Sequence, residues 1–197
     1  MNPERAYKQT ANEIIQLFEK YGDEDYDGEP VSQTSHMIQC AMEAMAEGED
    51  EELVIGSFLH DIGHLLKHIE HTEEMGSFGV VNHEGVGANY LKEKGFSKRI
   101  IAMVENHVNA KRYLVAVDDT YEAKLSEASL QTLQWQGGPM NDDEVKEFEQ
   151  HAFYDDIIKV RLWDEKAKDP EAVLLPLSHF KTLVTEYLKD RRYETQY

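Results

Sequence analysis

Two histidines and an aspartate stand in the apolar stretch SFLHDIGHLL, residues 57–66, which predicts a buried helix. They are His60, Asp61 and His64. Burying imidazole and carboxylate groups without partners costs free energy, and both groups are ligands that first-row transition metals accept. Adjacent residues of a helix point about 100° apart, so we expect His60 and Asp61 to reach one or two metals that lie beside the helix.

Three further histidines fall in predicted helices with apolar neighbours. His36 lies in the first turn of one helix, His83 at or near the start of another, and His107 within a third. A single buried histidine is more often a core residue with satisfied hydrogen bonds than a metal ligand. Four positions that share the pattern favour a metal site. Lys111 follows His107 by one helical turn, so the two share a neighbourhood.

Helical periodicity covers most of the chain, and YLVAVDD, residues 113–119, is the one strand-like run. Thr34 or Ser35, Ser97 and Asn141 are placed to cap the starts of helices. The sequence therefore predicts an all-α fold, with helices over residues 12–22, 34–48, 50–69, from about 83 to 95, 97–114, 142–150, 154–170 and 179–190.

Length and composition predict a single domain that spans residues 1–197. The formal net charge is −19, from 39 acidic and 20 basic residues, and it disfavours binding to nucleic acid or to an anionic membrane surface. No stretch approaches the roughly 18 apolar residues of a membrane span, and the N-terminus lacks the pattern of a secretory signal. With one cysteine, Cys40, the expected location is the cytoplasm.

His36, the motif HDIGH at residues 60–64 and the distant Asp164 resemble the metal-binding pattern of the HD-domain superfamily. The resemblance implies a helical bundle that holds metal through a histidine, a His-Asp pair and a late aspartate. Most members are phosphohydrolases, in which the metal activates water against a phosphate ester. His83 and His107 are additional, and such histidines mark members with a dinuclear centre.

Four further segments make the resemblance closer: YDGE at 26–29, HVNAKRYL at 107–114, QGGPM at 136–140 and RLWD at 161–164. They are similar to the mixed-valent diiron oxygenases that cleave organophosphonates, and the match runs from about residue 10 to 185. The resemblance implies two iron ions, active as an Fe(II)/Fe(III) pair bridged by Asp61. The implied ligands are His36, His60, Asp61, His83, His107 and Asp164.

The same resemblance implies the residues that bind substrate. A phosphonate dianion favours charge-assisted donors from several directions, and the matching positions are His64, Lys111, Ser129, Gln136 and Arg161. Tyr26 and Glu29 match a mobile loop in which the tyrosine occupies an iron until the carboxylate receives the substrate's amino group. We expect Tyr26, Glu29 and His64 to act in catalysis. An exposed acidic loop is the alternative interpretation of YDGE.

The implied reaction is the O2-dependent cleavage of the carbon–phosphorus bond in a 1-hydroxy-2-(amino or trimethylammonio)ethylphosphonate. The products are glycine or glycine betaine and phosphate, and the enzyme is expected to act after a 2-oxoglutarate-dependent hydroxylase that makes its substrate. The nitrogen substituents stay open, because Glu29 suits either cation and Tyr26 or Trp135 could help to cage a trimethylammonium group.

Two other functions compete with this one. The first is an HD-type phosphohydrolase that uses Mn or Mg, and His83 and His107 count against it, since hard ions do not need four imidazoles. The second is a binding or regulatory module without catalysis. It is disfavoured because every position of the motif holds a competent residue.

Overall fold

The structure is a computed structural model, and it describes residues 3–26, 28–69 and 80–194. These residues form helices joined by loops and turns, with an isolated antiparallel bridge between Asp25 and Ser32 and no sheet, which confirms the predicted all-α fold. The helices are α1 (Pro3–Tyr21), α2 (Gln33–Ala46), α3 (Glu51–Leu59), α4 (Ile62–Leu66), α5 (His83–Glu93), α6 (Lys98–Val117), η1 (Glu122–Lys124), α7 (Glu127–Trp135), α8 (Asp142–Phe148), α9 (Tyr154–Lys166) and α10 (Leu177–Glu194).

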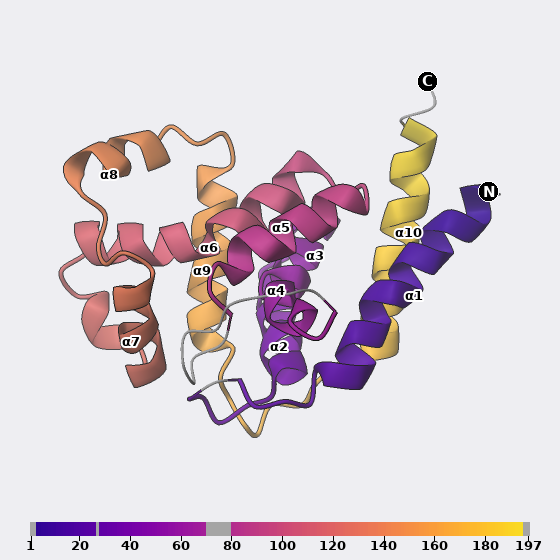
Figure 1. Cartoon of the computed structure of the whole chain (residues 1–197), viewed down its shortest axis with the longest axis horizontal. Helices are drawn as coiled ribbons and strands as arrows, with labels where there is room; N and C mark the ends of the chain where they lie inside the picture. Colours follow the sequence, from indigo (N-terminus) through magenta and orange to yellow (C-terminus); the bar gives the residue numbers. More distant parts are fainter. Residues whose placement is uncertain (1–2, 27, 70–79, 195–197) are drawn as a thin grey trace.

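The helices pack around a centre formed by α2, α3, α6 and α9, each of which contacts at least two of the others. Helices α1 and α10 lie side by side at one edge of the molecule, and α7 and α8 lie at the opposite edge (Figure 1). Phe58 of α3 stacks on Phe18 of α1 at 4.6 Å between ring centroids and on Phe180 of α10 at 4.5 Å. This stack joins the edge helices to the centre, and burial of each aromatic side chain contributes about 1.5–3 kcal/mol to stability.

The segment that carries the His-Asp pair is two helices rather than the single helix predicted over 50–69. Helix α3 ends at Leu59, and the backbone of Asp61 leaves helical geometry, with φ −105° and ψ 14°, before α4 begins. The break turns the Asp61 carboxylate away from the direction a continuous helix would give it. Gly63 then passes so close to α5 that a Cβ atom would lie 1.9 Å from the carbonyl oxygen of His83. Glycine is therefore required at this position of HDIGH.

Two of the three predicted caps at helix starts are confirmed. Ser97 caps α6 by accepting from the backbone N–H of Ile100, and Asn141 begins α8 with a capping box, as predicted. The prediction for α2 was wrong, because its cap is Ser32 rather than Thr34 or Ser35. The strand-like run at 113–119 is mostly helical, since α6 continues to Val117 and packs on α5 and α9. The helix predicted to begin at or near His83 and to end at Gly95 is confirmed as α5.

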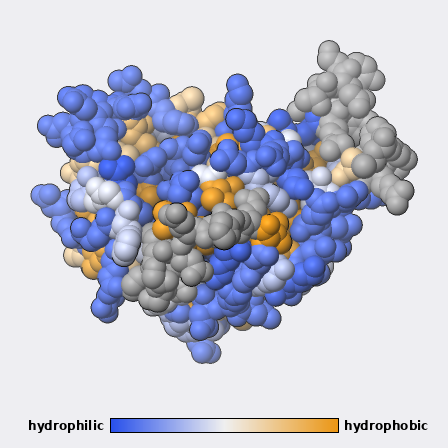
Figure 2. All heavy atoms as spheres, viewed as in Figure 1, coloured by the Kyte–Doolittle hydropathy of each residue, from blue (hydrophilic) through white to orange (hydrophobic). Residues whose placement is uncertain are grey.

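The face seen in Figure 2 is mostly hydrophilic, with small scattered apolar areas. Among the described residues, no helix is both long enough and apolar enough to cross a membrane.

Candidate metal centre and substrate pocket

Two groups of buried side chains each bring three ligand atoms together. The first consists of His36, His60 and Asp164, from α2, the α3–α4 junction and α9, and the second of Asp61, His83 and His107, from that junction, α5 and α6. Within each group the ligand atoms lie within 4.8 Å of one another. The structure thus brings together all six residues that the sequence indicated as ligands.

Asp61 lies between the two groups and faces each with a different oxygen. Its Oδ1 is 3.3 Å from His83 Nε2 and 3.1 Å from His107 Nε2. Its Oδ2 is 3.5 Å from the Nε2 atoms of both His36 and His60. A carboxylate in this position can bridge two metal ions, one bound by each group.

Each of the four histidines is oriented through its other ring nitrogen. The Nδ1 atoms lie 2.8–3.3 Å from the backbone carbonyl oxygens of Ala167, Ser57, Val80 and Val104, for His36, His60, His83 and His107 respectively. A carbonyl oxygen can only accept, so these contacts assign the proton to Nδ1 and leave the Nε2 lone pairs directed inward. Backbone atoms therefore prepare all four rings as ligands.

The Nε2 atoms lie so close together in pairs that a cation bound between them would explain their arrangement. The Nε2 atoms of His36 and His60 are 3.1 Å apart, and those of His83 and His107 are 3.0 Å apart. Among the described residues, Oδ1 of Asp61 and Oδ1 of Asp164 are buried without a hydrogen-bond donor. Burial opposes the charge of Asp61, yet the nearby His60 keeps the pKa of this carboxyl well below its usual range. Metal ions would satisfy these atoms together.

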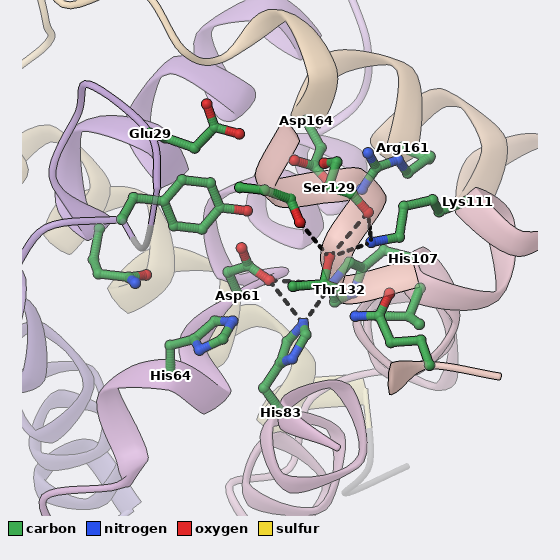
Figure 3. A pocket seen from close by; sticks show the side chains of 15 residues that line it. Glu29, Asp61, His64, His83, His107, Lys111, Ser129, Thr132, Arg161 and Asp164 are labelled. Atoms are coloured by element: carbon green, nitrogen blue, oxygen red, sulfur yellow. Dashed lines mark hydrogen bonds and ion pairs between the residues drawn. The ribbon is translucent and has the colours of Figure 1, made fainter. Parts of the chain in front are cut away.

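A pocket opens beside the two groups. Its charged side chains come from opposite sides, with Glu29 on one side and Lys111 and Arg161 on the other (Figure 3). The residues that line it are Tyr26, Glu29, Gln33, Asp61, His64, His83, His107, Val108, Lys111, Ala128, Ser129, Thr132, Gln136, Arg161 and Asp164. All seven residues predicted to bind substrate are among them. Which of these touch substrate stays a prediction.

Lys111 and Arg161 are almost fully buried cations, with 3% and 4% of their surface exposed. Lys111 donates to Thr132 Oγ1 at 2.9 Å and to the carbonyl oxygen of Ser129 at 3.3 Å, both uncharged acceptors. Burial and the nearby Arg161 lower the pKa of Lys111 to about 7. An arriving dianion would supply the negative charge that this ammonium group lacks.

Arg161 is held by three partners. It donates through Nε to the hydroxyl of Tyr121 at 2.9 Å and through one terminal nitrogen to Asp164 Oδ2 at 2.5 Å, and it forms an ion pair with Glu165. Burial opposes its charge, but Asp164 and the Tyr121 hydroxyl more than compensate, so the pKa of Arg161 is raised. Arg161 therefore connects a candidate metal ligand with the pocket wall.

His64 and Gln136 contribute uncharged polar groups. Nδ1 of His64 accepts from the backbone N–H of Val80 at 3.3 Å, and its ring stacks on His83 at 4.1 Å. Burial and the nearby His83 keep the pKa of His64 well below its usual range, so the ring is neutral with its proton on Nε2. The Oε1 atom of Gln136 is buried without a donor among the described residues.

Tyr26 and Glu29, the first and last residues of YDGE, both line the pocket. The Tyr26 ring stacks on His36 at 4.0 Å, and its backbone N–H donates to the carbonyl oxygen of Val31 at 2.9 Å. Glu29 folds back, donating through its backbone N–H to the carbonyl oxygen of Tyr26 at 2.7 Å. Only 8% of the Glu29 side chain is exposed, so the interpretation of these two residues as part of an exposed loop was wrong.

Sequence reasoning missed several polar residues around the pocket: Gln33, Tyr121, Thr132, Glu165 and Lys168. Glu165 and Lys168 follow Arg161 by four and seven residues, a spacing that places them along one helical face and could have indicated them. Trp135 was named as a possible aromatic wall for a cation, but it is 66% exposed and is not among the described residues that line the pocket.

Comparison with known proteins adds to this geometry. The HD-domain family profile matches residues 31–176. A [1-hydroxy-2-(trimethylamino)ethyl]phosphonate dioxygenase (glycine-betaine-forming) of Leisingera caerulea is 42% identical over 173 residues, 85% of each protein. A hydroxymethylphosphonate dioxygenase of Gimesia maris is 35% identical over 178 residues, 89% of this chain and 87% of the relative. The uncharacterised protein L432 of Acanthamoeba polyphaga mimivirus is 42% identical over 182 residues, 92% and 83% of the two chains.

Proposed function

The chain belongs to the HD-domain family, within the group that includes these phosphonate dioxygenases, and we propose that it is an enzyme that cleaves a carbon–phosphorus bond with O2. The proposed substrate is a 1-hydroxy-2-(amino or trimethylammonio)ethylphosphonate, and the products are glycine or glycine betaine and phosphate. One observation carries this proposal: Asp61 faces two buried ligand groups with its two oxygens, beside a pocket that contains two cationic side chains.

We propose iron as the metal in both groups. Each group consists of two imidazoles and one carboxylate, the donor set that is typical of non-haem iron oxygenases with open coordination positions. When bound, an Fe(II)/Fe(III) pair would supply the reaction with O2 and the removal of the hydrogen from C1 of the substrate. The protein's own contribution is to position that carbon and to keep the ligands fixed.

The charges of the pocket support one orientation of the substrate. Lys111 and Arg161 would bind the phosphonate oxygens, with Ser129 and Gln136 as further polar contacts. Glu29 lies on the opposite side and would receive the cationic group (Figure 3). With its two ends fixed in this way, the substrate presents C1 and its hydroxyl group to the candidate metal centre.

Tyr26 and His64 would control access and hydrogen bonding. The Tyr26 ring covers His36, so it must withdraw for substrate to reach the first ligand group. His64 is neutral and lines the pocket, and it offers an N–H donor that needs no change of charge. A tyrosine over the unliganded site would also limit reaction with O2 before substrate arrives.

The atom balance of the reaction indicates its place in a sequence of reactions. A 1-hydroxy-2-aminoethylphosphonate and one O2 contain all the atoms of glycine and phosphate, so no external reductant is required. The hydroxyl group at C1 must come from an earlier oxidation, for which we propose a 2-oxoglutarate-dependent hydroxylase. We also propose that residues 1–197 form one domain, of which the family match covers 31–176.

The proposal is tested by incubating the iron-loaded protein in air with 2-amino-1-hydroxyethylphosphonate and its trimethylammonio analogue, and measuring phosphate, amino acid and O2. Phosphate should appear only with O2, in equal amounts with the amino acid. Phosphate release from p-nitrophenyl phosphate or a nucleotide without O2, and none from the phosphonates, would instead identify a phosphohydrolase.

A further inference from the structure

Lys168 lies in the loop after α9 and contacts two carboxylates near the pocket. Its Nζ atom is 3.0 Å from Glu29 Oε1 and 3.4 Å from Glu165 Oε2. Only 13% of the Lys168 side chain and 8% of the Glu29 side chain are exposed. The pair is therefore largely shielded from water, where a charge interaction is stronger than at an open surface.

The same carboxylate oxygen has a second donor. The hydroxyl group of Ser126, the residue that caps α7, donates to Glu29 Oε1. Lys168 lies within 3.4 Å of that hydroxyl and also of Ser129 Oγ. These contacts join the Tyr26–Glu29 loop to the start of α7 and to the end of α9, with Lys168 at the junction.

Glu29 is thus already paired with a cation in the structure, although the proposed function requires it to receive a cation from the substrate. We propose that Lys168 is a specificity-determining residue that takes the place of the substrate's cationic group: it pairs with Glu29 in the free enzyme, holds that carboxylate beside the start of α7, and yields Glu29 when that group arrives. This inference rests on the proposed function, because it requires a substrate with a phosphonate at one end and a cation at the other.

Glu165 provides a partner for Lys168 once Glu29 is taken. In the structure Glu165 pairs with Arg161 as well as with Lys168. Arrival of a phosphonate at Arg161 competes with Glu165 for that guanidinium group and leaves the carboxylate to Lys168. Lys168 then keeps a counterion, so the exchange does not strand a buried charge.

With Asp61 and Asp164 set aside as members of the candidate metal groups, the remaining charged side chains in and beside the pocket balance with such a substrate. Lys111, Arg161 and Lys168 supply three positive charges, against two negative charges on Glu29 and Glu165. A dianionic phosphonate with one cationic substituent brings the total to four of each sign. A phosphonate without that substituent, such as hydroxymethylphosphonate, cannot replace Lys168 at Glu29 and leaves one negative charge in excess.

The test is the variant Lys168→Met, which keeps the length of the side chain but removes its charge. Binding of 2-amino-1-hydroxyethylphosphonate and of hydroxymethylphosphonate to the metal-loaded protein is measured by calorimetry without O2. The variant should bind the amino compound about tenfold more tightly relative to hydroxymethylphosphonate than wild type does, because a competing like charge has been removed. In the free protein, the backbone N–H groups of Gly28, Glu29 and Val31 should exchange with deuterium faster.

Two matched variants complete the experiment. Lys168→Arg keeps the charge and should behave as wild type in both measurements. Lys166→Met removes a neighbouring surface lysine, which pairs with Glu43 and Glu47, and should change neither measurement. If the role of Lys168 were only structural, Lys168→Met would bind both ligands more weakly, while hydrogen exchange near Glu29 became faster.

The proposal is overturned if Lys168→Met binds the amino compound more weakly than wild type, or if hydrogen exchange in the loop is unchanged. Failure of the proposed function is recognised separately, because wild type would then release no phosphate from either phosphonate in air.

Discussion

The metal centre and the ion-paired side chains beside the pocket are held in place in different ways. In the centre, backbone carbonyl oxygens of Ala167, Ser57, Val80 and Val104 fix the four histidine rings, and the groups are almost fully buried. Beside the pocket, ion pairs connect the side chains of Glu29, Lys168, Glu165 and Arg161, and the hydroxyl groups of Ser126 and Tyr121 add hydrogen bonds. Backbone partners make the ligands rigid in advance, whereas ion pairs can be exchanged for the charges of a substrate.

The largest effect should come from the centre. His83→Ala or His60→Ala removes a ligand that the fold has oriented, and should lower metal content and activity by more than about 100-fold, because loss of an outer-sphere partner alone costs about 10–100-fold. Metal counting after anaerobic reconstitution with iron measures this. His68→Ala is the control, since His68 pairs with Glu24 away from the site. Full metal content in His83→Ala would remove that residue from the ligand set.

For the cations of the pocket, the expected effects are smaller, and they concern the affinity for substrate. Lys111→Ala removes one buried cation that touches no candidate ligand, so it should weaken phosphonate binding by about 1.5–3 kcal/mol and leave metal content unchanged. Titration with substrate, followed through the iron absorption spectrum, decides this. Lys159→Ala, a surface lysine paired with Glu49, should bind as wild type.

Arg161→Ala tests both parts at once, because Arg161 contacts the candidate metal ligand Asp164 and also pairs with Glu165 beside the pocket. It should weaken phosphonate binding like Lys111→Ala, but it should also lower metal content, since Asp164 loses its donor. Equal metal content in the two variants would show that Asp164 does not depend on Arg161.

The pH dependence of binding should isolate Lys111. With a pKa lowered to about 7, its amine is charged below that pH and neutral above it, so dianion affinity falls as pH rises. Wild type should lose about tenfold in affinity per pH unit above 7, relative to Lys111→Arg, whose guanidinium stays charged. Taking the ratio of the two variants cancels titration of the phosphonate itself. A ratio that does not change between pH 6 and 9 would contradict the lowered pKa.

The smallest effect concerns Tyr26, which lines the pocket beside Glu29 and covers His36 of the metal centre. Tyr26→Phe keeps the stacking on His36 but lacks the hydroxyl group. The variant should bind substrate and turn over, yet lose activity a few-fold faster in air without substrate. Equal inactivation rates would refute the protective role and leave the metal assignment untouched.

The same contrast explains what the sequence could predict. Most helix positions, the Ser97 and Asn141 caps and the buried histidines follow from local patterns, and the structure brings the six candidate ligands together in two groups. The break at Asp61 was not predictable from periodicity, because its carboxylate meets three imidazoles from other helices as well as the neighbouring His60, and such long-range contacts override helical propensity.

Glu165 and Lys168, which sequence reasoning missed, belong to the ion-paired side chains beside the pocket. Lys168 matters because it pairs with Glu29, which comes from a distant part of the chain. Pairs of this kind depend on how α9, α7 and the loop after α1 come together, and no local pattern reports it. Trp135 shows the opposite error, since an aromatic residue beside a matching motif lies at the surface.

The most direct test of the central claim is the stoichiometry of O2 and phosphate with the iron-loaded protein. We predict that 2-amino-1-hydroxyethylphosphonate or its trimethylammonio analogue gives one phosphate per O2 consumed, without added reductant, and that His83→Ala gives none. Phosphate formed at the same rate under argon would contradict the assignment as an oxygenase.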